Sequence, residues 1–225
     1  MTRKIRPEQR CDHPTSMKSD SIRGLYAVTP DEIDTRALAA KVRAALSGGA
    51  KFVQYRNKTA TAAQRLEQAG VLLELCRQYG ARFIVNDHLD LASRLGADGL
   101  HLGAEDGPIA DARKKLGAGK IIGVSCYDSL SNAVDAQRQD ADYVAFGSFF
   151  PSGIKPEAVR APLALLREAK QRLAIPVVAI GGITLATAPQ LIAAGADGVA
   201  VISALFAAPD IKLAAQRFTA LFDKP

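Results

Sequence analysis

The segment Gly195-Ala196-Asp197-Gly198-Val199 joins the end of a helical pattern to a short apolar strand, and this junction decides the fold. An almost identical junction, Gly96-Ala97-Asp98-Gly99-Leu100, lies four strand-helix units earlier, and Ala141-Asp142-Tyr143 is a partial copy. Near-identical turns at matching positions predict a regular series of strand and helix pairs. We expect these turns to be structural and to lie at the end of the strands opposite the functional site.

Eight short runs rich in Val, Ile and other apolar residues are predicted to be strands. They are Leu25–Thr29, Lys51–Tyr55, Arg82–Asn86, Gly99–Leu102, Ile121–Ser125, Tyr143–Gly147, Pro176–Ile180 and Gly198–Ile202. Amphipathic segments between them, with apolar residues three and four apart, predict helices. This alternation indicates an α/β fold, a single closed (β/α)8 TIM barrel. An open doubly wound sheet is the alternative, disfavoured because no G-x-G-x-x-G follows the first strand.

Composition excludes several classes of protein. Of the 225 residues, 48% are hydrophobic and 23% are charged, which is typical of globular domains rather than disordered chains. No apolar run approaches the roughly 18 residues that span a bilayer. The three cysteines, Cys11, Cys76 and Cys126, lie far apart and form no disulfide or zinc motif. We therefore expect a cytoplasmic protein with no membrane partner.

The net charge of +6 is compatible with an anionic partner. Part of the positive excess lies in residues 1–22, which lack apolar periodicity. We expect these residues to form a short, disordered, basic tail, and residues 23–225 to form the barrel domain. The absence of tryptophan disfavours nucleic acid. Small phosphorylated molecules are the expected ligands, and a homo-oligomer is left open.

The active site of a (β/α)8 barrel gathers at the carboxyl ends of its strands, so the residues after each strand are the candidate functional residues. Arg56 and Lys58 lie two apart after the second strand, which predicts that both point to one side and meet phosphate oxygens. A solvated strand end is the alternative. Lys155, in the loop after the sixth strand, favours the phosphate interpretation.

Asp87 and Asp106 follow the third and fourth strands, which are neighbours in the predicted barrel. Because Mg²⁺ prefers a few carboxylate oxygens together with water and phosphate, this pair predicts a magnesium site. A helix N-cap explains either residue as well, and Glu105 is a competing ligand. His88 and His101 are interpreted as packing or polar-surface residues rather than ligands.

Residues typical of a phosphate-binding site follow two further strands. Gly181-Gly182 follows the seventh strand and Ile202-Ser203 follows the eighth. Many (β/α)8 barrels hold a phosphate in this region through backbone amides and a helix start. The glycine pair is also explained by a tight turn alone.

With these strand ends assembled, the chain resembles the thiamine-phosphate synthase family from Gly24 to about Phe222. The motifs that carry the resemblance are, in order, Gln54-Tyr55-Arg56-Asn57-Lys58, Asn86-Asp87, Gly103-Ala104-Glu105-Asp106, Gly123-Val124-Ser125, Ala145-Phe146-Gly147, Ile180-Gly181-Gly182-Ile183 and Val201-Ile202-Ser203-Ala204. The resemblance implies a transferase of thiamine biosynthesis. It would join 4-amino-2-methyl-5-hydroxymethylpyrimidine diphosphate to hydroxyethylthiazole phosphate, through loss of diphosphate and capture of the resulting cation by the thiazole nitrogen.

The resemblance also implies roles for individual residues. Asp87 and Asp106 would bind Mg²⁺ as the cofactor. Catalytic roles would fall to Arg56, Lys58, Ser125 and Lys155. The pyrimidine diphosphate would be held by Gln54, Tyr55, Arg56, Asn57, Lys58, Asn86, Ser125 and Lys155, and the thiazole phosphate by Ser152, Gly153, Ile154, Gly182, Ile202 and Ser203. Ser125 and Cys126 are not interpreted as a catalytic pair, and Cys126 is expected to be buried.

One position departs from the family pattern. Members usually carry a hydroxyl residue at the position of Ile154, and losing one hydroxyl-to-phosphate hydrogen bond is expected to cost about 1.5 to 3 kcal/mol of binding. Ala104 stands where the family has Gln, which is tolerable because the metal carboxylate is Asp106. Two alternatives stay open: a thiazole tautomerase, which has no diphosphate to bind, and a non-catalytic phosphate-binding barrel.

Overall fold

The computed structural model describes residues 22–151 and 159–223, and in this part of the chain strands alternate with helices up to β8, which two helices follow. The strands are β1 (Gly24–Val28), β2 (Phe52–Tyr55), β3 (Arg82–Asn86), β4 (Gly99–Leu102), β5 (Ile121–Tyr127), β6 (Tyr143–Phe146), β7 (Val177–Ile180) and β8 (Gly198–Val201). The helices are α1 (Thr35–Ser47), α2 (Ala62–Gln78), α3 (Leu89–Leu95), α4 (Ile109–Leu116), α5 (Leu130–Arg138), α6 (Leu163–Arg172), α7 (Ala188–Ala193), α8 (Ser203–Phe206) and α9 (Ile211–Ala220).

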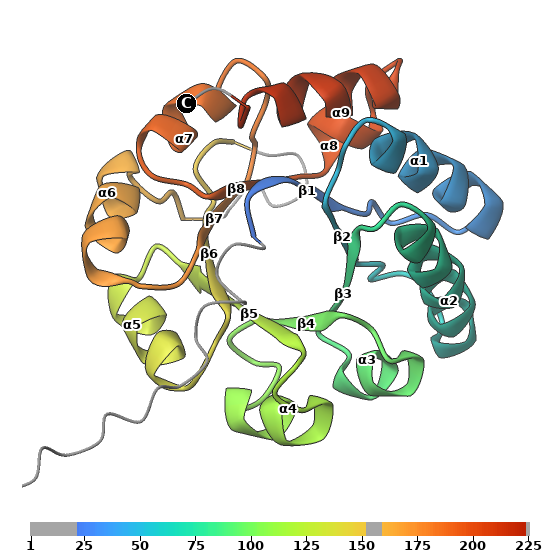
Figure 1. The fold of residues 1–225 in the computed structure, drawn as a ribbon, viewed down its shortest axis with the longest axis horizontal. Coiled ribbons are helices and arrows are strands. Elements are labelled where there is room, and N and C mark those ends of the chain that lie inside the picture. The colour runs from blue at the N-terminus through green and yellow to red at the C-terminus, as the bar shows by residue number, and fades with distance from the viewer. Residues whose placement is uncertain (1–21, 152–158, 224–225) are drawn as a thin grey trace, which may run out of the picture.

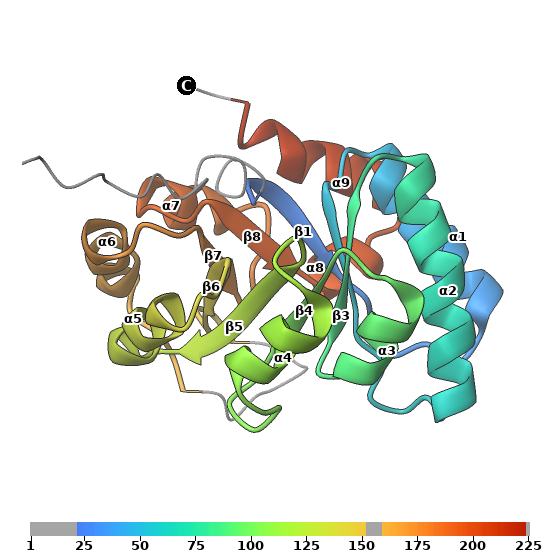
Figure 2. The ribbon, with the colours of Figure 1, turned by 60° about the horizontal axis from the view of Figure 1, so that its bottom comes forward.

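The strands form a closed barrel in sequence order (Figure 1). Each neighbouring pair is parallel, and β1 pairs with β8 to complete the ring. The helices lie around the outside of the barrel in both views (Figures 1 and 2). The predicted (β/α)8 barrel is therefore confirmed, and a doubly wound sheet is excluded because such a sheet has free edge strands. All the predicted strands are present, with small shifts at their ends, the largest being the extension of β5 to Tyr127.

The apolar residues divide into two clusters. The larger one fills the space between the outer face of the strands and the helices, and it includes Leu38, Leu72 and Phe218. The smaller one fills the barrel interior and includes Tyr26 and Tyr143. No helix in the described part of the chain is long and apolar enough to cross a membrane.

Ile22, which the prediction assigns to the tail, is 2% exposed and packs in the interior cluster, so the packing of the barrel begins at this residue. The rest of the predicted tail, residues 1–21, lies outside the described residues.

The repeated aspartate junctions lie at the amino ends of the strands. In each of them the carboxylate accepts a backbone N–H from the preceding odd-numbered strand: Asp98 from Phe83 (2.9 Å), Asp142 from Ile122 (2.8 Å) and Asp197 from Val177 (2.8 Å). These bonds satisfy backbone donors at the bottom of the barrel. The structural interpretation of the repeats is therefore confirmed, and the opposite end of the barrel is left for the site.

Candidate active site

Polar side chains occupy the inward-facing positions at the carboxyl ends of the strands. Every second residue of a strand faces the barrel interior. Gln54 is therefore the next inward-facing residue after Phe52 on β2, and Asn86 is the next after Ile84 on β3. Ser125 holds the corresponding place on β5, just before an irregularity in its pairing with β6. The apolar interior thus ends in a ring of hydrogen-bonding groups at the mouth of the barrel.

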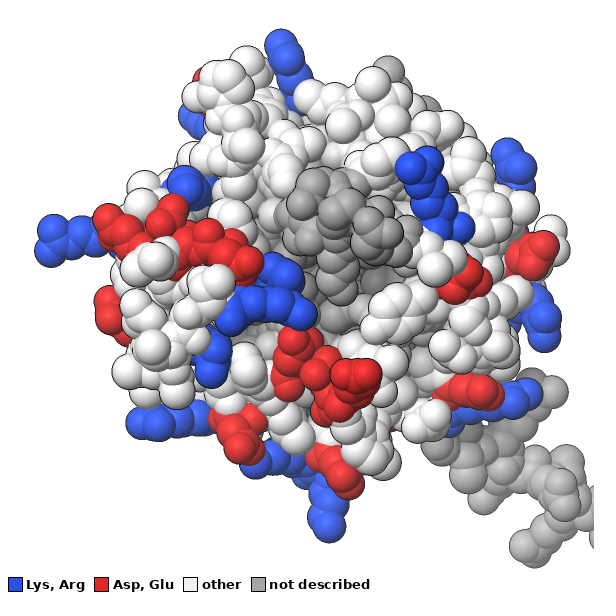
Figure 3. All heavy atoms as spheres, turned by 180° about the vertical axis from the view of Figure 1, so that it is seen from behind, with Lys and Arg blue, Asp and Glu red and all other residues white. Residues whose placement is uncertain are grey.

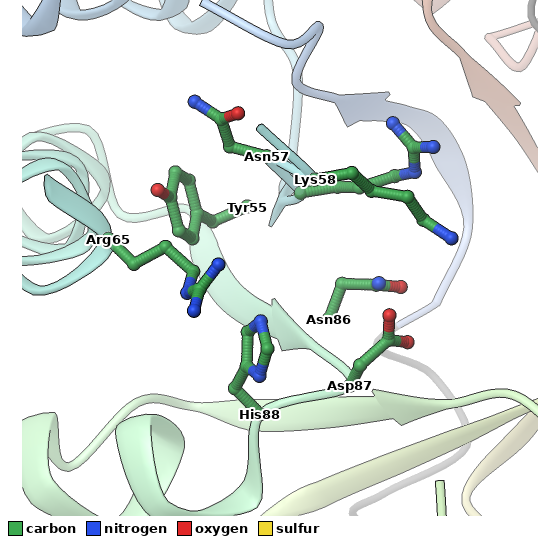
Figure 4. Close-up of a pocket in the computed structure, with 8 residues that line it drawn as sticks. Tyr55, Asn57, Lys58, Arg65, Asn86, Asp87 and His88 are labelled. Carbon is green, nitrogen blue, oxygen red and sulfur yellow. The ribbon is translucent and has the colours of Figure 1, made fainter. Parts of the chain in front are cut away.

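A cavity of about 210 Å³ opens beside this ring. It is lined by residues 55–58 at the end of β2 and just beyond it, residues 86–88 at the end of β3 and just beyond it, and Arg65 from the first turns of α2. Figure 4 shows the Lys58, Asn86 and Asp87 side chains pointing into a common space, with Arg65 and His88 directed toward each other on the side of α2. The face that carries the mouth has basic side chains directly beside acidic ones near its centre (Figure 3).

The cations predicted to meet phosphate lie at this cavity. The Arg56 guanidinium forms an ion pair with Asp31 (3.3 Å) while its side chain is 13% exposed. The loop is held by Thr29, whose hydroxyl donates to the Arg56 carbonyl and accepts from the Arg56 N–H. Both Arg56 and Lys58 lie close enough to Asp87 to favour its ionised form. The structure therefore brings two cations and a carboxylate together, as the sequence predicts.

Asp87 and Asp106 face each other across the ends of β3 and β4. Burial, a hydrogen bond with Asp106 and the charge of Asp106 raise the pKa of Asp87 to about 6, against the opposing charges of Lys58 and Arg56. Among residues 22–151 and 159–223 no group of three or more His, Cys, Asp and Glu side chains is placed to hold a metal. This carboxylate pair is consequently the candidate donor set for a cation that keeps its other positions for water or phosphate.

Neither carboxylate caps a helix, so the N-cap interpretation is wrong. The residue that precedes α3 is His88, with no side-chain cap bond, and the residue that precedes α4 is Pro108. Asp87 instead adopts a left-handed backbone with φ of 61°, which is strained for a residue with a side chain. Asp106 accepts the Gly103 N–H at 2.6 Å and so closes its own loop.

Two predicted ligand contacts are not supported by the side-chain geometry. The Asn57 amide donates to the Glu32 carbonyl and to Gln68 Oε1, and its oxygen accepts from Thr59 and Ala60. The Tyr55 hydroxyl donates to the same Gln68 Oε1 (2.9 Å). Because these groups already bond within the protein, both side chains organise the loop that carries Arg56 and Lys58.

Ser125 bonds to a histidine rather than to its neighbouring cysteine. Its hydroxyl lies 2.9 Å from Nε2 of His101, which is buried and whose pKa burial lowers to about 4. Cys126 is fully buried, as predicted, and burial raises the pKa of its thiol to about 12. The expectation that these two residues are not a nucleophilic pair agrees with this geometry, and His101 is a polar residue of the barrel interior.

Backbone conformation and close packing explain the glycine pair after β7. Gly181 and Gly182 have φ of 102° and 63°, and a Cβ at Gly182 would lie 2.4 Å from the Pro151 carbonyl oxygen. The glycines therefore let the start of the β6–α6 loop lie against the end of β7. Ile202 is partly buried against the interior cluster, and Ser203 opens α8 at the surface. The predicted contacts Ser152, Gly153, Ile154 and Lys155 lie outside the described residues.

The structure adds Arg65 and His88 to the cavity, which sequence reasoning did not assign to the site. Arg65 lies in the first turns of the helix that follows β2, and its side chain donates to the Ala60 carbonyl (2.6 Å). Helix starts adjoin the mouth of any (β/α)8 barrel, so a cation in the first turn was the available signal.

The fold and the site together define a (β/α)8-barrel protein with cations and paired carboxylates at the carboxyl ends of its strands. The sequence profile of a family described as "Thiamine monophosphate synthase" matches residues 25–205. The chain therefore belongs to the thiamine monophosphate synthase family, which is a family of enzymes.

Individual relatives match over nearly the whole chain. The thiamine-phosphate synthase of Thiobacillus denitrificans is 55% identical over 199 residues, which cover 88% of this chain and 94% of the relative. That of Nitrosospira multiformis is 52% identical over 203 residues, covering 90% and 87%. The solved structure of thiamine phosphate pyrophosphorylase from Pyrococcus furiosus superposes with a TM-score of 0.81 at 38% identity, covering 90% of this chain and 96% of that one.

Proposed function

We propose that this protein is a magnesium-dependent transferase that joins 4-amino-2-methyl-5-hydroxymethylpyrimidine diphosphate to hydroxyethylthiazole phosphate, giving thiamine phosphate and diphosphate. The observation that carries the proposal is the identity above 50% with thiamine-phosphate synthases over about nine-tenths of the chain. The site chemistry supports it, because the cavity places cations beside paired carboxylates, as a diphosphate-metal complex requires.

In this proposal the pyrimidine diphosphate lies between the ends of β2, β3 and β5. Arg56 and Lys58 neutralise the diphosphate oxygens, and Arg65 adds a third positive charge at the wall of the cavity. Gln54 and Asn86 supply amide groups at the interior edge of the same space. The side chains of Tyr55 and Asn57 hold the loop in place through their hydrogen bonds to Gln68.

Asp87 and Asp106 fit a magnesium ion. Both are hard oxygen donors, and burial together with the neighbouring Asp106 raises the pKa of Asp87, which is the condition that a divalent cation relieves. When bound, Mg²⁺ supplies positive charge toward the diphosphate oxygens.

The reaction places its main demand on charge stabilisation. The bond between the pyrimidinylmethyl carbon and the diphosphate oxygen breaks, with its electron pair leaving on the diphosphate, and the thiazole nitrogen lone pair forms the new bond to that carbon. Arg56, Lys58 and Lys155 stabilise the leaving diphosphate, and the barrel mouth holds both reactants in place. No nucleophilic side chain is needed, in keeping with the buried thiol of Cys126.

The thiazole phosphate is proposed to contact the loop after β6 together with Gly182, Ile202 and Ser203. Ile154 removes one hydroxyl from this set, so we expect the thiazole phosphate to bind more weakly, by about 1.5 to 3 kcal/mol, than it would with a hydroxyl residue at this position. We further propose a cytoplasmic enzyme whose residues before Ile22 are dispensable. Protein that begins at Ile22 should fold and turn over as the full chain does.

The test is diphosphate release by the purified protein with both substrates, with each substrate omitted, and with and without Mg²⁺. We expect release and thiamine phosphate only when both substrates and the metal are present. Isomerisation of the thiazole phosphate, with no diphosphate released when both substrates and Mg²⁺ are present, would contradict the proposal and favour a tautomerase. Binding of both ligands by folded protein without turnover would favour a binding barrel.

A matched pair of lysine variants tests the site itself. Lys58 follows the carboxyl end of β2, whereas Lys51 precedes its amino end, and both are exposed. Lys58→Met should lower kcat/KM for the pyrimidine diphosphate by about tenfold or more, because a charge-assisted bond to phosphate is lost. Lys51→Met should leave it unchanged. Equal effects in the two variants would place the diphosphate elsewhere.

A further inference from the structure

A chain of hydrogen bonds crosses the interior of the barrel and ends at its mouth. The Ser125 hydroxyl lies 2.9 Å from His101 Nε2, and His101 Nδ1 lies 2.8 Å from the Tyr143 hydroxyl. That hydroxyl lies 2.8 Å from the hydroxyl of Tyr26, which accepts a hydrogen bond from Gln54 Nε2 at 3.2 Å. The chain therefore links two strand ends assigned to the ligand, β5 and β2, through three side chains buried in the interior.

The glycine of the Gly123-Val124-Ser125 motif makes this chain possible. His101, Gly123 and Tyr143 pair across β4, β5 and β6 at one level of the barrel. A Cβ on Gly123 would lie 1.9 Å from Cζ of Tyr143, so the missing side chain is the space that the tyrosine ring occupies. The His101 and Tyr143 rings then approach to a centroid distance of 5.5 Å.

The donors and acceptors order themselves in one direction. The amide of Gln54 donates to Tyr26, so the proton of the Tyr26 hydroxyl is free to go to Tyr143. In the order that gives both tyrosine hydroxyl protons of the chain an acceptor, Tyr26 donates to Tyr143 and Tyr143 donates to Nδ1 of His101, 2.8 Å away. A neutral imidazole that accepts at Nδ1 carries its proton on Nε2, which donates to Ser125. The Ser125 hydroxyl proton then has no acceptor within this chain.

We propose that His101, Tyr143 and Tyr26 are positioning residues that hold His101 as the Nε2–H tautomer and thereby make the Ser125 hydroxyl a hydrogen-bond donor to an anionic oxygen of the ligand. This inference rests on the proposed function, in which that oxygen belongs to a diphosphate. Without the chain, the Ser125 hydroxyl could equally donate inward to the imidazole and present only lone pairs to the ligand. Lone pairs would repel a diphosphate oxygen, whereas a directed donor stabilises it.

The first experiment reads the tautomer directly and needs no ligand. Protein labelled with ¹⁵N-histidine has separate resonances for protonated and unprotonated ring nitrogens, and the His13→Gln and His88→Gln variants assign the signals of His101. We expect the proton on Nε2 in the parent protein, and a mixture of tautomers in Tyr143→Phe. A proton on Nδ1 in the parent protein, or the same tautomer in Tyr143→Phe, would overturn the positioning role.

The second experiment measures binding of magnesium diphosphate by calorimetry. Ser125→Ala should weaken binding by about tenfold or more, since a bond to a charged oxygen is lost. Tyr143→Phe should weaken it by a smaller factor, and Tyr26→Phe by less again, because Tyr143 can still donate to His101. The Tyr143→Phe and Ser125→Ala double variant should bind within about twofold of Ser125→Ala alone, because Tyr143 acts through Ser125. Additive effects would overturn the proposal.

Tyr79→Phe is the matched control. The Tyr79 hydroxyl also accepts a side-chain hydrogen bond from Ser47 (3.2 Å), but it lies at the far end of α2. Tyr79→Phe should leave both the His101 tautomer and diphosphate affinity unchanged.

If the parent protein binds no magnesium diphosphate while His101 carries its proton on Nε2, the ligand assignment and the proposed function are refuted but the hydrogen-bond order stands. If His101 carries its proton on Nδ1 and the protein still binds magnesium diphosphate tightly, only the proposed order of hydrogen bonds is refuted.

Discussion

Replacing Asp106 by Asn is expected to make the metal-free protein more stable at neutral pH, although it removes a residue of the site. The reason is the neighbouring carboxylate, since the pKa of Asp87 is raised from 3.8 to about 6, first by burial and then by Asp106. A carboxylic acid with a higher pKa in the folded chain holds its proton more tightly there. The Asp87 carboxyl therefore stabilises the folded protein at pH values below its unfolded pKa of 3.8. This contribution to the free energy of unfolding is lost as the pH rises to about 6.

The magnitude follows from the same shift. Unscreened, a difference of about two pKa units corresponds to about 3 kcal/mol. Asp87 is only half-buried, so solvent screening reduces this value, and the contribution of burial remains after Asp106 is changed. We expect Asp106→Asn to raise the free energy of unfolding by about 1 kcal/mol at neutral pH. The Asn oxygen can still accept the Gly103 N–H, so the loop is retained.

The assay is urea unfolding in the presence of a chelator, at neutral pH and at a pH below the unfolded pKa of Asp87. Glu105→Gln is the control, because it removes the same charge from an exposed position of the same loop. The gain should appear only for Asp106→Asn and only at neutral pH. Added Mg²⁺ should stabilise the parent protein and not this variant. An Asp106→Asn protein no more stable than the parent, or a gain as large in Glu105→Gln, would refute the reasoning.

Three further predictions follow from the described contacts. Asp98→Ala should lower the free energy of unfolding by about 1 to 3 kcal/mol in urea titrations, because the Phe83 N–H loses its acceptor, whereas Asp98→Asn keeps an acceptor and should lose less. Gly182→Ala should cost about 2 to 4 kcal/mol in the same titration, since its φ is 63° and its Cβ would meet the Pro151 carbonyl. Cys126, whose thiol pKa burial raises to about 12, should be labelled by a thiol reagent only after unfolding, as mapped by mass spectrometry.

The eight strands and their alternation with helices could be predicted from the sequence because their signals are local, whereas the short α8 before α9 was not predicted. Segments with a strand pattern of apolar residues alternate with segments that have a helix pattern, and the Gly-Ala-Asp-Gly turns mark where β4 and β8 begin. The strand ends that carry Arg56, Lys58, Asp87 and Asp106 could also be predicted, because every parallel strand of a barrel ends at the same face. The family resemblance then added roles to positions that the barrel had already selected.

Which groups meet at that face was decided by the tertiary structure. Local patterns left Asp87 and Asp106 as possible helix caps, and only the closed barrel turns them toward each other. Tyr26 and Tyr143 are 117 positions apart and read as core aromatics, yet ring closure brings their hydroxyls to 2.8 Å. Hydrogen bonding and pKa depend on distance and burial, which arise from contacts between strands and are not encoded in the periodicity of any single segment.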